Sequence, residues 1–218
     1  METHRKRNKK YNIPGHAHFL TFSCYKRQPL LTNDKWRLWL AESIHKKCIE
    51  FKIDLWAYVF MPEHVHLLLK PRLESYDLAR YEQSFKLSWS KTVLNHLLKV
   101  KSPLLEKIRS KDGYRLWQPG GGFDLNIWTM KKAIEKAEYC HNNPVKRKLV
   151  KTPEAWRWSS YRWLELGKRE GEPLHMTDWN ETLLHDEPLE SPESNALISK
   201  SKSVAPELQS KARRVSKE

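Results

Sequence analysis

The stretch IDLWAYVFMPEHVHLLLK, residues 53–70, contains two apolar runs on either side of a short turn signal. The runs IDLWAYVF (53–60) and HVHLLLK (64–70) have the length of strands and are rich in apolar side chains. Met61-Pro62 lies between them. Strands joined by so short a connection pair in antiparallel fashion, so this stretch predicts two neighbouring strands of one sheet.

Two further elements are predicted before this stretch. The segment HAHFLTFSCY (16–25), rich in aromatic and β-branched residues, is typical of a strand. A helix is indicated from Asn33 or Asp34, as its cap, to about Phe51. Its apolar residues at helical spacing are Trp36, Leu40, Ile44 and Cys48.

After the stretch, a long helix is expected from about Tyr76 to Lys99, followed by a charged surface loop over residues 100–116. GFDLNI (122–127) predicts a short strand. Thr129 is placed to cap a last helix, which begins at Met130 and should end near Asn142. This end is expected because Pro144 lacks an amide proton and disfavours helical geometry at the preceding residue.

The order strand, helix, strand, strand, helix, strand, helix predicts an α+β fold, with a central antiparallel sheet and flanking helices. We expect a basic leader at residues 1–12, a folded body at 13–166 and a loosely ordered or disordered tail at 167–218. The tail is rich in Pro, Ser, Glu and Lys and has no aromatic residue after Trp179.

Charge is concentrated in the body. The whole chain carries a formal net charge of +14. Residues 1–164 hold 32 Lys and Arg against 15 Asp and Glu, a net charge of +17, and residues 165–218 hold 8 against 11. Such an excess, interleaved with aromatic residues, indicates a polyanion-binding protein, and nucleic acid is the expected partner. The alternative is a basic protein whose charge serves solubility.

Composition also excludes several classes. No apolar run approaches the roughly 18 residues of a membrane span, and the basic N-terminus is not followed by a signal core. We therefore expect a cytoplasmic protein without a membrane partner. The odd number and wide spacing of Cys24, Cys48 and Cys140 argue against a disulfide framework or a thiolate zinc site. We expect these thiols to be reduced and buried.

His64 and His66 are two residues apart in a predicted strand, so their side chains should project from one face of the sheet. Two imidazoles side by side can bind a metal, and apolar residues around them would hold both rings rigidly. The alternative is a pair of surface histidines at a strand end. The spacing therefore gives a candidate metal site.

Tyr139 and Asn143 are four residues apart near the end of the last predicted helix, so they share a helix face. Most helical tyrosines only pack. A phenol has a reference pKa of about 10, so a tyrosine nucleophile needs a nearby metal or cation.

Four segments, in this order and spacing, resemble the REP-associated tyrosine transposases, which are IS200-like members of the HUH single-strand endonuclease superfamily. These segments are MPEHVHLLLKP (61–71), LWQPGGGFD (116–124), YCHNNPVKRKLV (139–150) and AWRWSSYRW (155–163). The resemblance covers roughly residues 11–164. It implies a ferredoxin-like fold with the nucleophile on a C-terminal helix.

The resemblance implies a role for each matching residue. His64 and His66 match the histidines that bind a divalent metal, Mg²⁺ or preferably Mn²⁺. Tyr139 matches the nucleophile, and Asn143 matches the polar residue that completes the metal shell. The implied reaction cuts single-stranded DNA, leaving a 5′-phosphotyrosine link and a free 3′ hydroxyl.

The implied partner is a palindromic repeat folded as a single-strand hairpin, bound by a monomer or a homodimer. The basic candidates for phosphate contacts and the aromatic candidate for base stacking are Lys86, Lys91, Lys146, Arg147, Lys148 and Trp117. Trp156 and Trp158 are further stacking candidates, with core packing as the alternative for each tryptophan.

Two other functions stay open from the sequence. One is a metal-dependent nuclease in which the histidines activate water and Tyr139 is structural, so that no covalent DNA adduct forms. The other is a domesticated DNA-binding regulator with little turnover. A denaturing gel of the protein mixed with labelled hairpin DNA and Mn²⁺ distinguishes the three.

Overall fold

The computed structural model describes residues 10–174, 176, 177 and 179. Its main elements follow the predicted order of strands and helices. They are β1 (Ala17–Ser23), α1 (Asp34–Phe51), β2 (Ile53–Phe60), β3 (His64–Pro71), α2 (Leu78–Lys99), β6 (Phe123–Ile127) and α4 (Met130–Lys146). The smaller elements are the 3-10 turns Tyr25–Arg27, Leu30–Thr32 and Pro153–Ala155, with α3 (Leu104–Lys107), β4 (Arg109–Ser110), β5 (Gly113–Tyr114) and α5 (Tyr161–Leu166).

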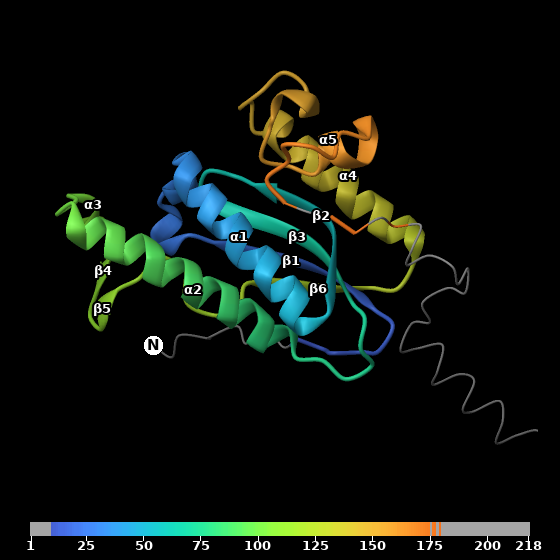
Figure 1. Ribbon diagram of the computed structural model, residues 1–218, viewed down its shortest axis with the longest axis horizontal. Coiled ribbons are helices and arrows are strands. Elements are labelled where there is room, and N and C mark those ends of the chain that lie inside the picture. Colours follow the sequence, from blue (N-terminus) through green and yellow to red (C-terminus); the bar gives the residue numbers. More distant parts are fainter. Residues whose placement is uncertain (1–9, 175, 178, 180–218) are drawn as a thin grey trace, which may run out of the picture.

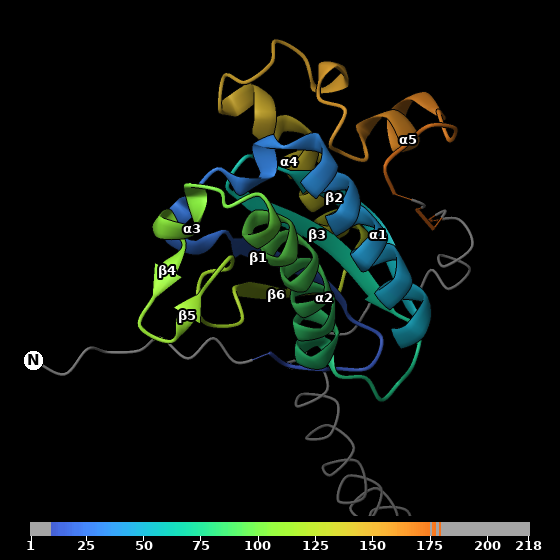
Figure 2. The ribbon, with the colours of Figure 1, turned by 60° about the vertical axis from the view of Figure 1, so that its left-hand side comes forward.

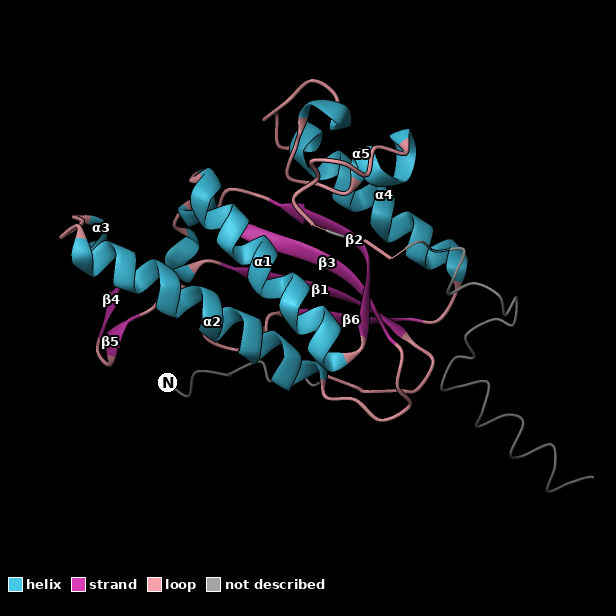
Figure 3. Ribbon diagram, in the orientation of Figure 1, coloured by secondary structure: helices cyan, strands magenta, loops and turns pink. Residues whose placement is uncertain are grey.

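The four long strands form one antiparallel sheet in the order β2-β3-β1-β6 (Figure 3). The predicted strands β2 and β3 are neighbours in this sheet, with Tyr58 opposite Leu67. Strand β3 is an inner strand, flanked by β1 on its other side. The sheet and its flanking helices confirm the predicted α+β class.

Helices cover both faces of the sheet. Helices α1 and α2 lie side by side on one face, and α4 crosses the opposite face (Figures 1 and 2). Because side chains alternate along each strand, the sheet contributes to two apolar layers. Leu67 packs beneath α1 and α2 with Leu40 and Phe85, whereas Leu68 packs beneath α4 with Ala137.

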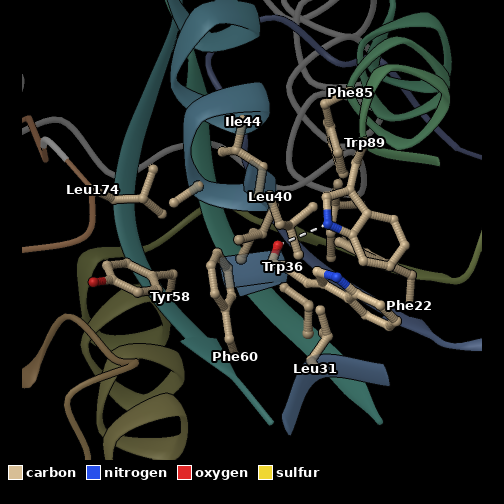
Figure 4. Close-up of a cluster of buried hydrophobic side chains, with 14 of the residues drawn as sticks. Phe22, Leu31, Trp36, Leu40, Ile44, Tyr58, Phe60, Phe85, Trp89 and Leu174 are labelled. Carbon is tan, nitrogen blue, oxygen red and sulfur yellow. Dashed lines mark hydrogen bonds between the residues drawn. The ribbon is translucent and has the colours of Figure 1, made fainter. Parts of the chain in front are cut away.

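The larger layer is rich in aromatic side chains (Figure 4). Trp89 of α2 is 1% exposed, and its indole nitrogen donates a hydrogen bond of 2.8 Å to the carbonyl of Trp36 on α1. This bond joins the two helices across the core. Burial of Trp36, Leu40 and Ile44 confirms the helical spacing, and the side chain of Asn33 caps α1 at the amide of Trp36.

The segment 100–116 is more structured than a charged surface loop. It contains α3 and the small β4–β5 hairpin, and Ile108 and Leu116 are buried at 0% and 4% exposure. Leu104, Leu105 and Tyr114 are partly buried against the same core. Ile108 lies between Lys107 and Arg109 in the sequence, so no periodicity indicates its burial.

The prediction that the last helix ends near Asn142 is wrong, because α4 continues through Pro144 to Lys146. Proline removes one hydrogen bond of the helix, but the next turn forms its own. The amide of Arg147 donates to the carbonyl of Asn143 at 3.0 Å, and that of Leu149 donates to Pro144 at 2.9 Å. The buried ring of Pro144 packs within the fold, and this packing offsets the missing bond.

The chain after α4 returns to the outer edge of β2. The amide of Phe60 donates to Trp158 at 2.8 Å, and that of Ser160 donates to Tyr58 at 3.0 Å. Ser160 also holds α4, since its hydroxyl lies 3.0 Å from Nε2 of the buried His141. These contacts cover a strand edge that would otherwise be unpaired and fix α4 to the sheet.

Part of the expected tail packs on this edge as well. Leu174 and Met176 are buried, and the indole of Trp179 donates to the carbonyl of Trp56 at 2.8 Å. Residues 1–9 of the expected leader and 180–218 of the expected tail lie outside the described residues.

Within the described part of the chain, no helix is long and apolar enough to span a membrane. The three cysteines are free and buried, as predicted.

Candidate active site

His64 and His66 lie at the start of β3 on the face covered by α4. Their rings are 4.8 Å apart between centroids and nearly perpendicular. The ring of Phe19, from β1, stacks on His66 at 5.3 Å. His66 is 4% exposed, whereas His64 is more open. The prediction that both imidazoles share one face of a central strand is confirmed.

The Nδ1 atom of each histidine has its own partner. Thr21 of β1 places its hydroxyl 2.7 Å from Nδ1 of His66, because Thr21 is paired with His66 across the sheet. Nδ1 of His64 lies 3.0 Å from a carboxylate oxygen of Glu63. The same oxygen accepts a hydrogen bond of 2.8 Å from Arg147, at the end of α4. Such partners fix the orientation of both rings, and they occupy Nδ1 rather than Nε2 of each histidine.

Both histidines are held in the neutral form. Burial lowers the pKa of His66 to about 3, and the neighbouring His64 adds to this shift. Burial also lowers the pKa of His64, although the carboxylate of Glu63 opposes it. Neutral imidazole is the form that binds metals, so the pair is ready to act as ligands near neutral pH.

Helix α4 brings Tyr139 to the same point. Its ring is 5.2 Å from that of His66 and 5.9 Å from that of Phe19, both in edge-to-face geometry. Tyr139 is 39% exposed, which leaves the phenol open to a substrate. The ammonium groups of Lys136 and Lys146 lie 6.0 and 5.5 Å from its ring centroid. Cations at this distance stabilise negative charge near the phenol.

Asn143, one helical turn after Tyr139, is buried against His66. Its amide nitrogen Nδ2 donates to Nε2 of His66 at 3.1 Å. Rotating the carboxamide of Asn143 by half a turn puts its oxygen, in place of Nδ2, beside Nε2 of His66. The carboxamide oxygen and the imidazole nitrogen can then face one cation. No cluster of three His, Cys, Asp or Glu side chains occurs among the described residues. A metal here would therefore depend on Asn143 as its third protein ligand.

The predicted DNA-contact residues fall into two groups. Lys146 lies over Tyr139, and Arg147 binds Glu63, so the structure brings both to the candidate site. The neighbouring Lys148 is exposed. Lys86, Lys91 and Trp117 lie away from it: two are on α2, across the sheet, and the third follows the β4–β5 hairpin.

The three tryptophans considered for base stacking are packed against other residues of the fold. Trp117 rests against Trp89 and Phe22, with centroids at 4.5 and 5.2 Å. Trp158 is 5% exposed, and Trp156 donates its indole hydrogen to the carbonyl of Phe60. Core packing, the alternative raised from the sequence, therefore describes Trp158 well.

Sequence reasoning missed four side chains of the site: Phe19, Thr21, Glu63 and Lys136. Two of them carried a usable signal, because Glu63 precedes His64 and Lys136 lies three residues before Tyr139 on the same helix. Phe19 and Thr21 carried none. Their contact with His66 follows from the pairing of β1 with β3.

The chain thus carries a histidine pair on an antiparallel sheet beneath a helix that bears Tyr139. The chain belongs to the family of IS200-like transposases, whose model matches residues 13–135. This match spans more than half of the chain and includes both histidines. It ends before Tyr139.

Two solved structures are similar to this chain, and the first of them shares the fold. One is a REP-associated tyrosine transposase bound to a REP hairpin, with 19% identity, a TM-score of 0.61 and coverage of 86% of this chain and 98% of that chain. Another, a candidate transposase from Deinococcus radiodurans R1, has 17% identity, a TM-score of 0.39 and coverage of 65% and 97%. Comparison with curated proteins gives no match.

Proposed function

We propose that this transposase is a metal-dependent single-strand DNA endonuclease and strand transferase that uses Tyr139 as its nucleophile. The observation that carries the proposal is the convergence of groups from two elements. The histidine pair of β3 meets Tyr139 and Asn143 of α4, with the Tyr139 and His66 rings 5.2 Å apart. All of these groups come from one chain.

The donor set fits a divalent cation. Two neutral imidazoles and a carboxamide oxygen suit Mn²⁺, and Mg²⁺ is the harder alternative. A bound metal of this kind would withdraw charge from a non-bridging phosphate oxygen. His64, His66 and Asn143 would hold it from the protein side. The open side toward Tyr139 would be left for the phosphate.

The chain's own residues account for the covalent step. The phenol oxygen of Tyr139 forms a bond to phosphorus, and the bond from phosphorus to the 3′ oxygen breaks, leaving a free 3′ hydroxyl. The phenol proton can pass to water, because Tyr139 is 39% exposed, and water supplies one proton to the leaving 3′ oxygen. Lys136 and Lys146 stabilise the negative charge at the phosphate. The 5′-phosphotyrosine link keeps the ester bond energy, so the strand can be rejoined without ATP.

We propose a hairpin of the repetitive extragenic palindrome type as the substrate. The support is the structure of similar fold that is bound to a REP hairpin, together with the net charge of +17 on residues 1–164. Lys146 lies beside Tyr139, where it can contact the phosphates on either side of the cleaved bond.

The test is a denaturing gel of the protein incubated with labelled hairpin DNA and Mn²⁺. The wild-type protein should form a band of protein joined to DNA, and Tyr139→Phe, which removes only a hydroxyl, should form none. Tyr11→Phe is the control, because Tyr11 is an exposed tyrosine far along the chain from the site. An adduct that persists in Tyr139→Phe would show that another residue is the nucleophile.

The metal ligands should behave differently. His64→Ala should lower adduct formation through metal affinity, so that excess Mn²⁺ restores part of it. If the wild-type protein nicks the DNA strand without forming a covalent adduct, water is the nucleophile. Hairpin binding without any cleavage would favour a regulator.

A further inference from the structure

The chain turns sharply after β1, at the 3-10 turn Tyr25–Arg27. Lys26 and Arg27 are consecutive residues in the left-handed region, with φ values of 50° and 52°. In this region the Cβ of any residue but glycine crowds the backbone, so the surrounding structure must offset the strain of both residues. Strained backbone of this kind clusters at functional sites.

This turn lies beside the histidine pair of the candidate active site. Strand β1 ends at the residue that is paired with His64 across the sheet. The amide of Cys24 donates to the carbonyl of Glu63 at 2.8 Å, one residue before His64. On the other side, the amide of Lys26 donates to the side chain of Gln118 at 3.2 Å. A turn fixed from two sides presents its side chains from a constant position.

The charge of Arg27 reaches the candidate metal site. Burial lowers the pKa of His64, and the positive charges of Arg147 and Arg27 lower it further. Solvent-exposed charges are screened beyond about 10 Å, so the guanidinium of Arg27 lies close to this histidine. Glu63, the carboxylate beside His64, is already bonded to Arg147. In the part of the chain that the structure describes, the exposed side chain of Arg27 forms no ion pair.

The neighbouring Lys26 provides a contrast within the same turn. It is exposed like Arg27, carries the same charge and has nearly the same φ. Its ammonium lies 5.2 Å from the ring centroid of Tyr25. The larger effect on the pKa of His64 comes from Arg27. Of the two cations, Arg27 is therefore the one held toward the candidate site.

We propose that Arg27 is a further catalytic residue, which binds the phosphate at the cleavage site. When the phenol oxygen of Tyr139 attacks phosphorus, negative charge grows on the two non-bridging oxygens. One of them faces the histidine pair, and the guanidinium of Arg27 donates hydrogen bonds to the other. Arginine stays protonated throughout, so Arg27 gives and takes no proton. This inference rests on the proposed function, because it needs a phosphate beside His64.

The experiment measures the rate of adduct formation in a single turnover, at saturating hairpin DNA and Mn²⁺. Arg27→Gln should lower this rate roughly a hundredfold, which is the usual loss for one donor to a developing charge. Arg27→Lys keeps the charge but not the planar fork of donors, so its rate should be intermediate. Lys26→Gln is the matched control, because it removes the same charge from the same turn. It should keep the wild-type rate.

Binding is measured separately, on the full chain as Tyr139→Phe with EDTA. Arg27→Gln and Lys26→Gln should lose affinity for the hairpin to the same small extent, because each removes one positive charge. An equal loss of rate in the two variants overturns the proposal. A rate of Arg27→Gln that more DNA restores also overturns it. So does a rate that excess Mn²⁺ restores, since Arg27 would then act through the metal site.

A change in the phosphate tests the contact itself. Hairpin DNA with a methylphosphonate at the cleavage site lacks one non-bridging oxygen, and its two stereoisomers lack different ones. The wild-type protein should cut one isomer as slowly as Arg27→Gln cuts normal DNA, and Arg27→Gln should cut that isomer no more slowly. If neither isomer behaves in this way, Arg27 does not contact the phosphate.

The outcomes separate this inference from the proposed function. If the wild-type protein and Arg27→Gln form the adduct equally fast, the role of Arg27 alone is rejected. If the wild-type protein nicks DNA without an adduct, Tyr139 is not the nucleophile, and the rates of nicking in the same variants test Arg27. A wild-type protein that does not cut hairpin DNA rejects both.

Discussion

The imidazole of His66 is held by three residues from two elements, β1 and α4. Phe19 stacks on its face, Thr21 engages Nδ1, and Asn143 engages Nε2. A ring fixed in this way presents one nitrogen in one direction, which lowers the entropic cost of binding a metal. The contact with Thr21 can be tested without touching a proposed ligand.

Thr21→Val should weaken the binding of the Mn²⁺ that adduct formation requires. Valine keeps the shape but removes the hydroxyl, so the half-saturating Mn²⁺ concentration should rise roughly tenfold. The yield at saturating Mn²⁺ should remain close to that of the wild type. Thr92→Val, at an exposed position on α2, is the control. An unchanged Mn²⁺ titration in Thr21→Val contradicts the role assigned to this hydroxyl.

His141 should make stability depend on pH. Burial lowers the pKa of His141 to about 4, whereas an unfolded histidine has a pKa of about 6.5. Between these values the unfolded chain binds more protons, so the free energy of unfolding should fall as pH drops from about 6.5 to 4. His66 contributes in the same direction, so a variant is needed to isolate His141.

His141→Gln should flatten this dependence. The difference in unfolding free energy between pH 7 and pH 4.5 should shrink by on the order of 2 kcal/mol relative to the wild type. Urea denaturation at the two pH values, in EDTA, measures it. Equal pH dependence in both proteins would mean that His141 is protonated as readily in the fold as in the unfolded chain.

Helix α4 is the element that assembles the site. Its apolar face packs Ala137 and Cys140 on the sheet, and the bond from His141 to Ser160 fixes its rotation. Tyr139 and Asn143 then face His66. The connection from β5 to β6 lies close to β1, since the amide of Gln118 donates to the carbonyl of Ser23 at 2.9 Å.

Gly122→Ala should destabilise this connection. A Cβ at Gly122 would meet the carbonyl of Thr21 at 2.3 Å, and the residue has a φ of +68°. We expect a loss of about 1–3 kcal/mol in the free energy of unfolding. Gly120→Ala is the control, because φ is +96° but nothing lies within 4 Å of the added carbon. Equal losses in chemical denaturation would show that φ alone, and not the contact, decides.

At the scale of the whole molecule, the body carries more positive charge than the chain's total suggests. Residues 1–164 have a net charge of +17, against +14 for the full sequence. Binding to a nucleic acid should therefore be driven largely by release of counterions from the phosphates.

Hairpin binding should weaken steeply with salt. A plot of the logarithm of the binding constant against the logarithm of salt concentration should be linear, with a slope of about −0.7 for each single-strand phosphate contacted. Fluorescence anisotropy between low and moderate salt measures it. Random duplex of the same length should bind more weakly. A flat salt response, or equal affinity for both DNAs, contradicts this prediction.

The sequence by itself determined the elements that depend on local spacing. Alternation in β3 placed His64 and His66 on one face, and the apolar spacing with an Asn33 cap defined α1. These predictions succeed because each depends on residues a few positions apart. The resemblance to a transposase family added Tyr139 and Asn143, and the structure brings both beside His66.

Only the tertiary structure decided which distant residues meet. Thr21 reaches His66 through strand pairing, and α4 continues through Pro144 because packing offsets the lost hydrogen bond. A pocket of about 370 Å³ lies where α2 faces the chain before β6. Contacts of this kind join residues far apart in sequence, and no local period encodes them.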